Sequence, residues 1–126
     1  MALIHIALHF IVPLLVAASF YRPRWRNAYL ILVATMLVDI DHLLADPIYD
    51  PERCSIGFHP LHSLPAIVVY FGLFMVPLLF GRNRRDAREP GHLGVTSRAL
   101  HLVGLGLLIH MALDGIDCHS PEQFLF

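Results

Sequence analysis

The sequence has little charge and no lysine. Only 15% of its 126 residues are charged, and the formal net charge is −1 although nine arginines are present. The 56% apolar content and the lack of a net positive charge exclude a disordered chain, a collagen-like repeat and a nucleic-acid-binding surface. No internal repeat or low-complexity stretch divides the chain. We therefore expect one domain over residues 1–126 that has no nucleic-acid partner.

Long apolar runs fill most of this domain. A membrane-spanning helix needs about 20 largely apolar residues. Almost no polar face remains on these runs to meet water, which disfavours the alternative of a soluble bundle with buried helices. The sequence therefore predicts an all-α fold, a four-helix integral membrane bundle in the lipid bilayer. Its helices are expected at residues 3–20, 28–44, 61–80 and 94–113.

The first apolar run is expected to stay in the protein. No positively charged residue precedes it, as would be usual in a secretory signal peptide. Val16-Ala17-Ala18 could mimic a cleavage site, but the run carries His5 and His9. Because we expect His5 and His9 to belong to the functional site, we expect this segment to be retained in the protein.

Arginine positions orient the predicted bundle. Cytoplasmic loops of membrane proteins are enriched in Lys and Arg. Eight of the nine arginines lie at the two connections that four spans place on one side: Arg22, Arg24, Arg26, Arg82, Arg84, Arg85, Arg88 and Arg98. Both termini should then be extracytoplasmic. Eight of the ten acids and seven of the nine histidines lie toward the opposite, periplasmic side.

The histidines and acids come in pairs at helical spacing. Residues three or four apart share one face of a helix. Counted from the nearest arginines at about 1.5 Å per residue, each pair lies roughly 18–30 Å from the cytoplasmic boundary. The pairs can therefore meet in one layer: His5 and His9, Asp39 and His42, His59 and His62, and His110 and Asp114.

Ionisable groups inside a bilayer cost several kcal/mol and usually mark a function. Imidazole with carboxylate suits a divalent transition metal, zinc first, with manganese, iron and nickel as alternatives. The number of candidates favours two ions over one. The predicted ligands are His5, His9, Asp39, Asp41, His42, His59, His62, His110 and Asp114. His92 and His101 receive no role, and His119 is interpreted as a solvated tail residue.

At these residues the sequence resembles the bacterial membrane-bound predicted metal-dependent hydrolases, whose best-known member is a LexA-regulated inner-membrane protein. The resemblance rests on His5, on Asp39-Ile40-Asp41-His42, on His59 with His62-Ser63, and on His110 with Asp114. Val38 stands where that family has proline, and the third motif is two residues shorter, as in a short branch with four helices. The resemblance implies a metal-dependent hydrolase of the bacterial inner membrane.

The first functional hypothesis is hydrolysis of a phosphoester or a lipid-derived substrate at the periplasmic face. Two metals suit such substrates because they can hold the attacking and leaving oxygens. Asp41 or Asp39 could act as the general base. Arg53 could pair with a phosphate, although a solvated charge or an ion pair is the plainer interpretation, and Ser63 is a weaker substrate-binding candidate.

Two other functions stay open. A metal transporter or transfer protein needs polar groups along a route across the membrane. The cytoplasmic halves of the predicted spans offer almost none, which counts against transport. A structural metal that only holds the helices together is the remaining alternative, and closed coordination would support it. A homodimer is allowed by the sequence but not required by it.

The two cysteines lie on the predicted periplasmic side. Cys54 is in the second connection, and Cys118 follows the fourth helix. Disulfides persist in that compartment, so these two could pair and tie the connection over the site. Free thiols or soft metal ligands are the alternatives.

Overall fold

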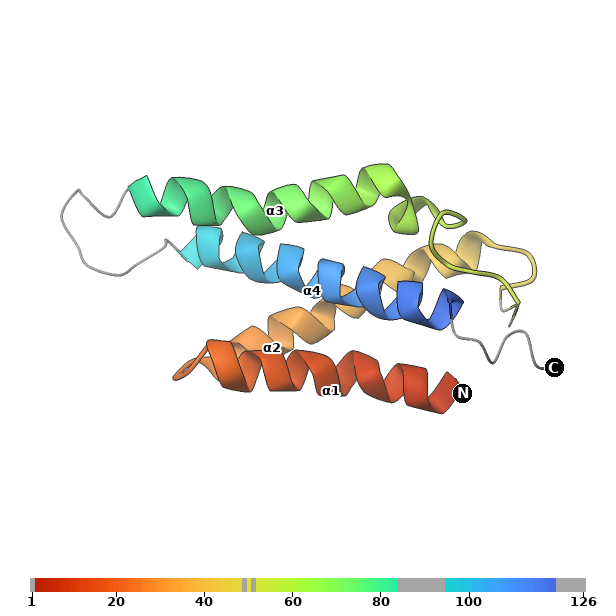
Figure 1. The fold of residues 1–126 in the computed structure, drawn as a ribbon, viewed down its shortest axis with the longest axis horizontal. Helices are drawn as coiled ribbons and strands as arrows, with labels where there is room; N and C mark the ends of the chain where they lie inside the picture. Colours follow the sequence, from red (N-terminus) through yellow and green to blue (C-terminus); the bar gives the residue numbers. More distant parts are fainter. Residues whose placement is uncertain (1, 49, 51, 84–94, 120–126) are drawn as a thin grey trace.

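The computed structural model describes residues 2–48, 50, 52–83 and 95–119. All regular secondary structure in these residues is helical, and it forms four main helices (Figure 1). This confirms the predicted all-α class. The elements are α1 (Ala2–Phe20), α2 (Trp25–Ala34) with its continuation η1 (Thr35–Leu44), η2 (Pro60–His62), α3 (Leu64–Asn83) and α4 (Val95–Cys118).

The second helix changes its winding halfway along. After Ala34 the chain continues as a ten-residue 3₁₀-helix, which was not predicted. The hydroxyl of Thr35 donates a 2.6 Å hydrogen bond to the carbonyl of Leu32 at this junction. In a 3₁₀-helix, residues three apart lie directly above one another. Asp39 and His42 are therefore presented on the same side of η1.

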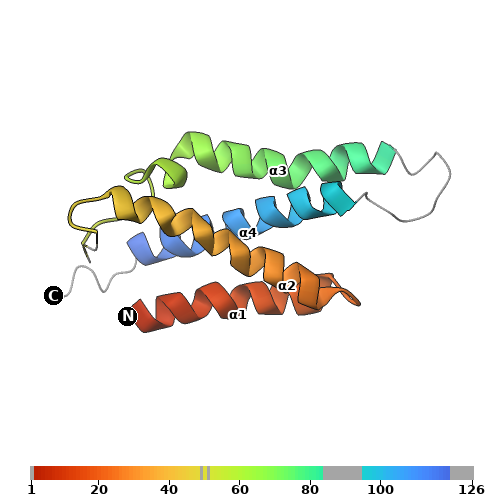
Figure 2. The same cartoon turned by 180° about the vertical axis from the view of Figure 1, so that it is seen from behind.

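Helix α4 is the centre of the bundle and packs against the other three main helices (Figures 1 and 2). Two glycines permit this. A Cβ at Gly104 would clash with the backbone of Leu73 and Phe74 on α3, and one at Gly106 would lie 2.7 Å from the Thr35 side chain. These two glycines therefore allow α4 to approach α3 and the α2–η1 helix closely. The fourth helix is also five residues longer than the predicted end at 113.

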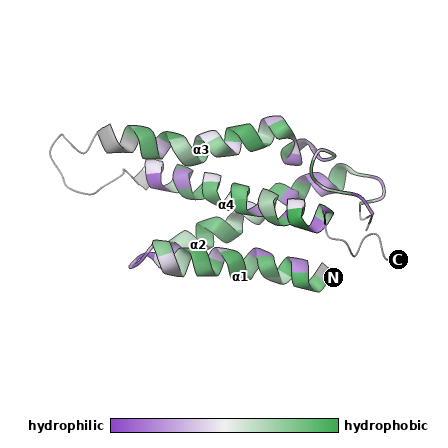
Figure 3. Cartoon of the chain, viewed as in Figure 1, coloured by the Kyte–Doolittle hydropathy of each residue, from purple (hydrophilic) through white to green (hydrophobic). Residues whose placement is uncertain are grey.

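Apolar side chains cover the outside of the bundle. Leu3 is 83% exposed and Leu37 is 75% exposed, whereas polar residues such as His62 are fully buried. Figure 3 shows that hydrophobic residues predominate along the main helices. Three helical segments are long and apolar enough to cross a membrane: Leu3–Phe20, Trp25–Leu44 and Thr96–Cys118; Leu64–Phe80 is a shorter apolar helix. This pattern is the reverse of a soluble protein and is typical of a chain surrounded by lipid.

The two ends of the bundle differ in chemistry. The turn after α1 lies at the same end as the start of α4, and Arg22, Arg24, Arg26 and Arg98 are found there (Figure 1). His101, also near this end, accepts a 2.8 Å hydrogen bond from the Tyr21 hydroxyl and donates one of 3.0 Å to the Phe74 carbonyl. His101 is buried and both of its ring nitrogens are hydrogen-bonded, so it needs no metal ion. Arg84, Arg85, Arg88 and His92 lie outside the described residues.

Candidate metal centre

The opposite end of the bundle brings all nine predicted ligands into three groups. Helix α1 supplies two of them, η1 three, the chain around η2 two, and α4 two. Within each group, one potential ligand atom per residue lies within 4.8 Å of the others. The central group is Asp39, His62, His110 and Asp114; the second is His5, His9 and Asp114; the third is Asp41, His42 and His59.

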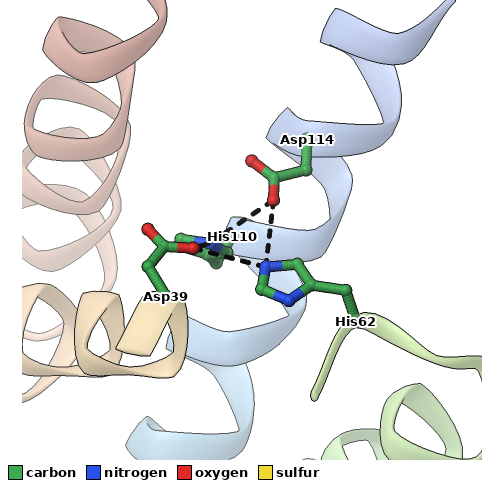
Figure 4. Close-up of side chains that lie close together, drawn as sticks. All are labelled: Asp39, His62, His110 and Asp114. Atoms are coloured by element: carbon green, nitrogen blue, oxygen red, sulfur yellow. Dashed lines mark hydrogen bonds and ion pairs between the residues drawn. The ribbon is translucent and has the colours of Figure 1, made fainter. Parts of the chain in front are cut away.

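The central group joins η1, η2 and α4 (Figure 4). Asp39 Oδ1 lies 3.3 Å from His62 Nε2 and 3.0 Å from His110 Nε2. Asp114 Oδ2 lies 3.2 Å from His62 Nε2 and 3.5 Å from His110 Nε2. Two carboxylate oxygens and two imidazole nitrogens therefore alternate around a closed ring of contacts.

These distances fit a divalent transition ion. Ligands about 2.1 Å from a tetrahedral zinc lie about 3.4 Å from one another. The four contacts of the central group span 3.0–3.5 Å. In addition, Nε2 of His62 is buried with no hydrogen-bond partner. A buried polar atom without a partner is costly, and a bound cation would satisfy it.

Asp114 belongs to two groups because its two oxygens face in different directions. Oδ2 faces the central group, while Oδ1 lies 3.1 Å from His5 Nε2 and 3.4 Å from His9 Nε2. The Nδ1–H of His9 donates to the His5 carbonyl at 3.0 Å. That bond leaves the lone pair on His9 Nε2, which is buried and without a hydrogen-bond partner. The second group thus offers three ligands. For His9, the hydrogen bond also fixes the tautomer that can bind a metal ion through Nε2.

Asp41 supports the central group from behind. Its Oδ2 accepts hydrogen bonds from the Leu61 backbone N–H at 2.8 Å and from His62 Nδ1 at 3.2 Å. A carboxylate behind a histidine ring fixes its tautomer and orientation for metal binding through the other nitrogen. The structure thus gives Asp41 a positioning contact with His62, where the sequence suggested a general base.

The pKa values of His62 and His59, which both lie outside the helical spans, shift in opposite directions. Burial alone would lower the pKa of His62, but the neighbouring carboxylates of Asp114, Asp39 and Asp41 outweigh it and raise the pKa to about 10. Burial, followed by the neighbouring His42 ring, lowers the pKa of His59 below its usual value. In the metal-free protein a proton on His62 therefore compensates part of the carboxylate charge.

Two predicted substrate contacts have structural partners instead. The Arg53 guanidinium lies 3.5 Å from Asp50, donates to the Pro47 carbonyl at 2.8 Å and covers the Phe58 ring. The Ser63 hydroxyl donates to the Pro60 carbonyl at 2.7 Å and accepts from the Ala66 N–H, which caps the start of α3. Neither residue belongs to one of the three ligand groups.

The two cysteines are joined in the structure. A disulfide links Cys54, in the segment between η1 and η2, to Cys118 at the end of α4. It holds this connection beside the last turn of α4, four residues after Asp114. In the structure these two cysteines are therefore neither free thiols nor metal ligands.

Sequence reasoning missed residues that hold the ligands in place. The Ser55 hydroxyl lies 3.1 Å from His42 Nε2, and the Tyr70 hydroxyl donates to the Leu61 carbonyl at 2.9 Å. No local pattern marks Ser55, because its partner lies across a loop. Tyr70 lies in the largely apolar helix α3, and its hydrogen bond steadies the turn that carries His62.

Comparison with known proteins places the chain in a family but gives it no activity. Residues 1–83 match the family of unknown function DUF6122, and these residues include seven of the nine predicted ligands. Neither the curated proteins nor the solved structures contain a match. The match covers about two thirds of the sequence, through the end of α3. The chain therefore belongs to the DUF6122 family.

Proposed function

We propose that this protein is a membrane-embedded metal-dependent hydrolase with two metal positions that share Asp114. The observation that carries the proposal is the division of that carboxylate. One oxygen faces two histidines of α1, and the other faces His62 and His110. A carboxylate shared in this way is typical of two-metal hydrolytic centres. The resemblance to predicted metal-dependent hydrolases supports the same reaction class.

The two positions differ in the number of ligands that the protein supplies. The central group has four, which is the full number for tetrahedral zinc, whereas the second group has three and leaves a position open. Bound divalent ions would supply a water nucleophile at neutral pH and charge stabilisation for a phosphoester. His5 is 25% exposed at its side chain, so the open side of the second group can be reached from outside the bundle.

Asp39 is the better candidate for the proton acceptor. Its side chain is 42% exposed, while that of Asp41 is 3% exposed and is engaged with His62 and Leu61. A general base must reach the proton that it accepts. Asp39 is also a ligand candidate of the central group, so one of its oxygens would face the ion and the other would remain for proton transfer.

A lipid-derived phosphoester is the substrate that we would test first. An open apolar groove runs between the α2–η1 helix and α4, and its lining includes Ile31, Ala34, Val38 and Leu107. Val38 precedes Asp39, and Leu107 lies one turn before His110. An acyl chain in this groove would direct its head group toward the central group, which is the reason for preferring a lipid over a soluble ester.

We further propose that the bundle crosses a bacterial inner membrane with the metal centre on the periplasmic side. The arginines at the opposite end support this orientation. It can be tested with Arg24→Cys and Glu52→Cys, both at exposed positions. A membrane-impermeant thiol reagent on intact cells should label Glu52→Cys only, and Arg24→Cys only after the membrane is opened. The reverse result would overturn the orientation.

A structural metal site is the second candidate, because the central group alone offers closed coordination. Phosphoesterase assays on detergent-purified, zinc- or manganese-loaded protein separate the two. The hydrolase proposal predicts turnover of a phospholipid or aryl phosphoester that is lost in His9→Ala, with His119→Ala as the matched control. Full metal loading with no turnover of any ester tested would favour the structural role.

A further inference from the structure

The third group, Asp41, His42 and His59, lies where the outer connection folds back onto η1. The Gly57 N–H donates to the His62 carbonyl at 2.9 Å, and the His59 N–H donates to the Ser55 carbonyl at 3.3 Å. Gly57 has φ +84°, a conformation that favours glycine and allows the chain to reverse here. The disulfide at Cys54 fixes the preceding part of the same connection. His59 is thereby held against η1.

Asp41 and His42 face each other without making a hydrogen bond. Asp41 Oδ1 lies 3.2 Å from His42 Nδ1, yet both atoms are buried and lack a hydrogen-bond partner. The second polar atom of each side chain already has a hydrogen bond. Asp41 Oδ2 bonds His62 and the Leu61 N–H, and His42 Nε2 bonds the Ser55 hydroxyl. Two buried polar atoms at this distance, each without a partner, leave an energetic cost that a shared cation would remove.

His59 completes the group from the other side. It is 3% exposed, and its ring stacks on that of His42 with centroids 3.9 Å apart. Among the residues that the structure describes, its ring nitrogens make no hydrogen bond, and its ring contacts are with His42, Phe58 and His62. All three residues offer ligand atoms within 4.8 Å of one another.

We propose that Asp41, His42 and His59 form a third metal position, which takes a divalent transition ion of the zinc type. Two imidazoles and one carboxylate are the ligands that such ions prefer. The position shares no ligand with the Asp114 pair, and its existence does not depend on hydrolysis. It is nevertheless coupled to the central group, because the second oxygen of Asp41 holds His62. An ion here would fix Asp41 and hence the orientation of the His62 ring.

The test is a zinc count on the full chain in detergent, equilibrated with buffered Zn²⁺ and measured by mass spectrometry. Wild-type protein should hold three ions per chain, and His59→Ala should hold two. His9→Ala should also hold two, and the double variant should hold one, because the two substitutions remove different positions. His119→Ala is the matched control and should hold three, since His119 belongs to none of the three groups and, within the described part of the chain, bonds the Gly115 carbonyl.

Several outcomes would overturn the third position. Two ions in wild type, unchanged in His59→Ala, would overturn it and leave the Asp114 pair standing. Three ions in both proteins would overturn the assignment to these residues. If the wild-type protein holds one ion and His59→Ala holds none, the two Asp114 positions are overturned and the third position stands. If His59→Ala does not fold, Ser55→Ala replaces it. That variant should weaken one of the three ions by about 10–100-fold, the usual effect of removing a partner behind a ligand, and three unchanged affinities would overturn the proposal.

Discussion

Replacing Asp114 with asparagine should weaken two metal positions at once. The substitution keeps the size of the side chain, which is 6% exposed, but removes its charge and turns one oxygen into an amide group. Each of the two carboxylate oxygens has two histidine nitrogens within 3.1–3.5 Å. No orientation of the amide can therefore restore the negative charge that Asp114 gives to either group.

The magnitude follows from this double role. Removing only a partner behind a ligand costs about 10–100-fold in metal affinity, so we expect loss of a charged ligand to cost at least about 100-fold at each position. Over two positions this amounts to roughly 5.5 kcal/mol, since every tenfold change is about 1.4 kcal/mol. His9→Ala, which removes a ligand from one position only, should lose about half as much.

The assay is competition for zinc against chelators of graded affinity, on folded protein in detergent. Asp117→Asn is the matched control, because Asp117 lies one turn along α4 from this region, is 52% exposed and approaches His5 only to 3.9 Å. Its substitution should change affinity by less than about tenfold, as for other exposed charges. Loss of a single ion in Asp114→Asn, equal to the loss in His9→Ala, would refute the shared role of Asp114.

Three further predictions concern other parts of the molecule. Zinc affinity should rise by about tenfold per pH unit between about pH 6 and pH 9. The reason is that His62, with a pKa of about 10, carries a proton that the ion must displace, so zinc binding should release protons. A zinc affinity that does not change with pH would contradict this. Reduction of the Cys54–Cys118 disulfide should lower the melting temperature, at a cost of about 2–5 kcal/mol, and should weaken the third metal position more than the Asp114 pair in zinc titrations. Gly106→Ala should destabilise the bundle by about 1–3 kcal/mol through its contact with Thr35, whereas Gly72→Ala, whose Cβ meets nothing within 4 Å, should be neutral or stabilising by up to about 1 kcal/mol in thermal melts.

The fold was largely predictable because the apolar runs are long and their polar residues are paired. Helical spacing placed His110 and Asp114 on one face of α4, and both reach the central group. The lengths of the runs gave four helices in the expected order. What spacing could not show was the 3₁₀ winding of η1, because polar residues three apart share a face in an α-helix as well as in a 3₁₀-helix.

The division into three groups was also beyond the sequence. His59 and His62 were expected to act as a pair at helical spacing. In the structure His59 has an extended backbone, with ψ 144°, and only Pro60–His62 form a short 3₁₀ turn. The two rings therefore enter different groups. Likewise, nothing in the sequence indicates that the two oxygens of Asp114 face different histidines, because that depends on where α1 lies against α4.

The most direct test of the central claim is the electron paramagnetic resonance spectrum of the Mn²⁺-loaded protein. Two ions that share the Asp114 carboxylate lie close enough to couple magnetically. We expect a spectrum of coupled manganese pairs that disappears in Asp114→Asn and persists in Asp117→Asn. A spectrum of isolated manganese alone, at one ion or fewer per chain, or a coupled spectrum that survives Asp114→Asn, would contradict it.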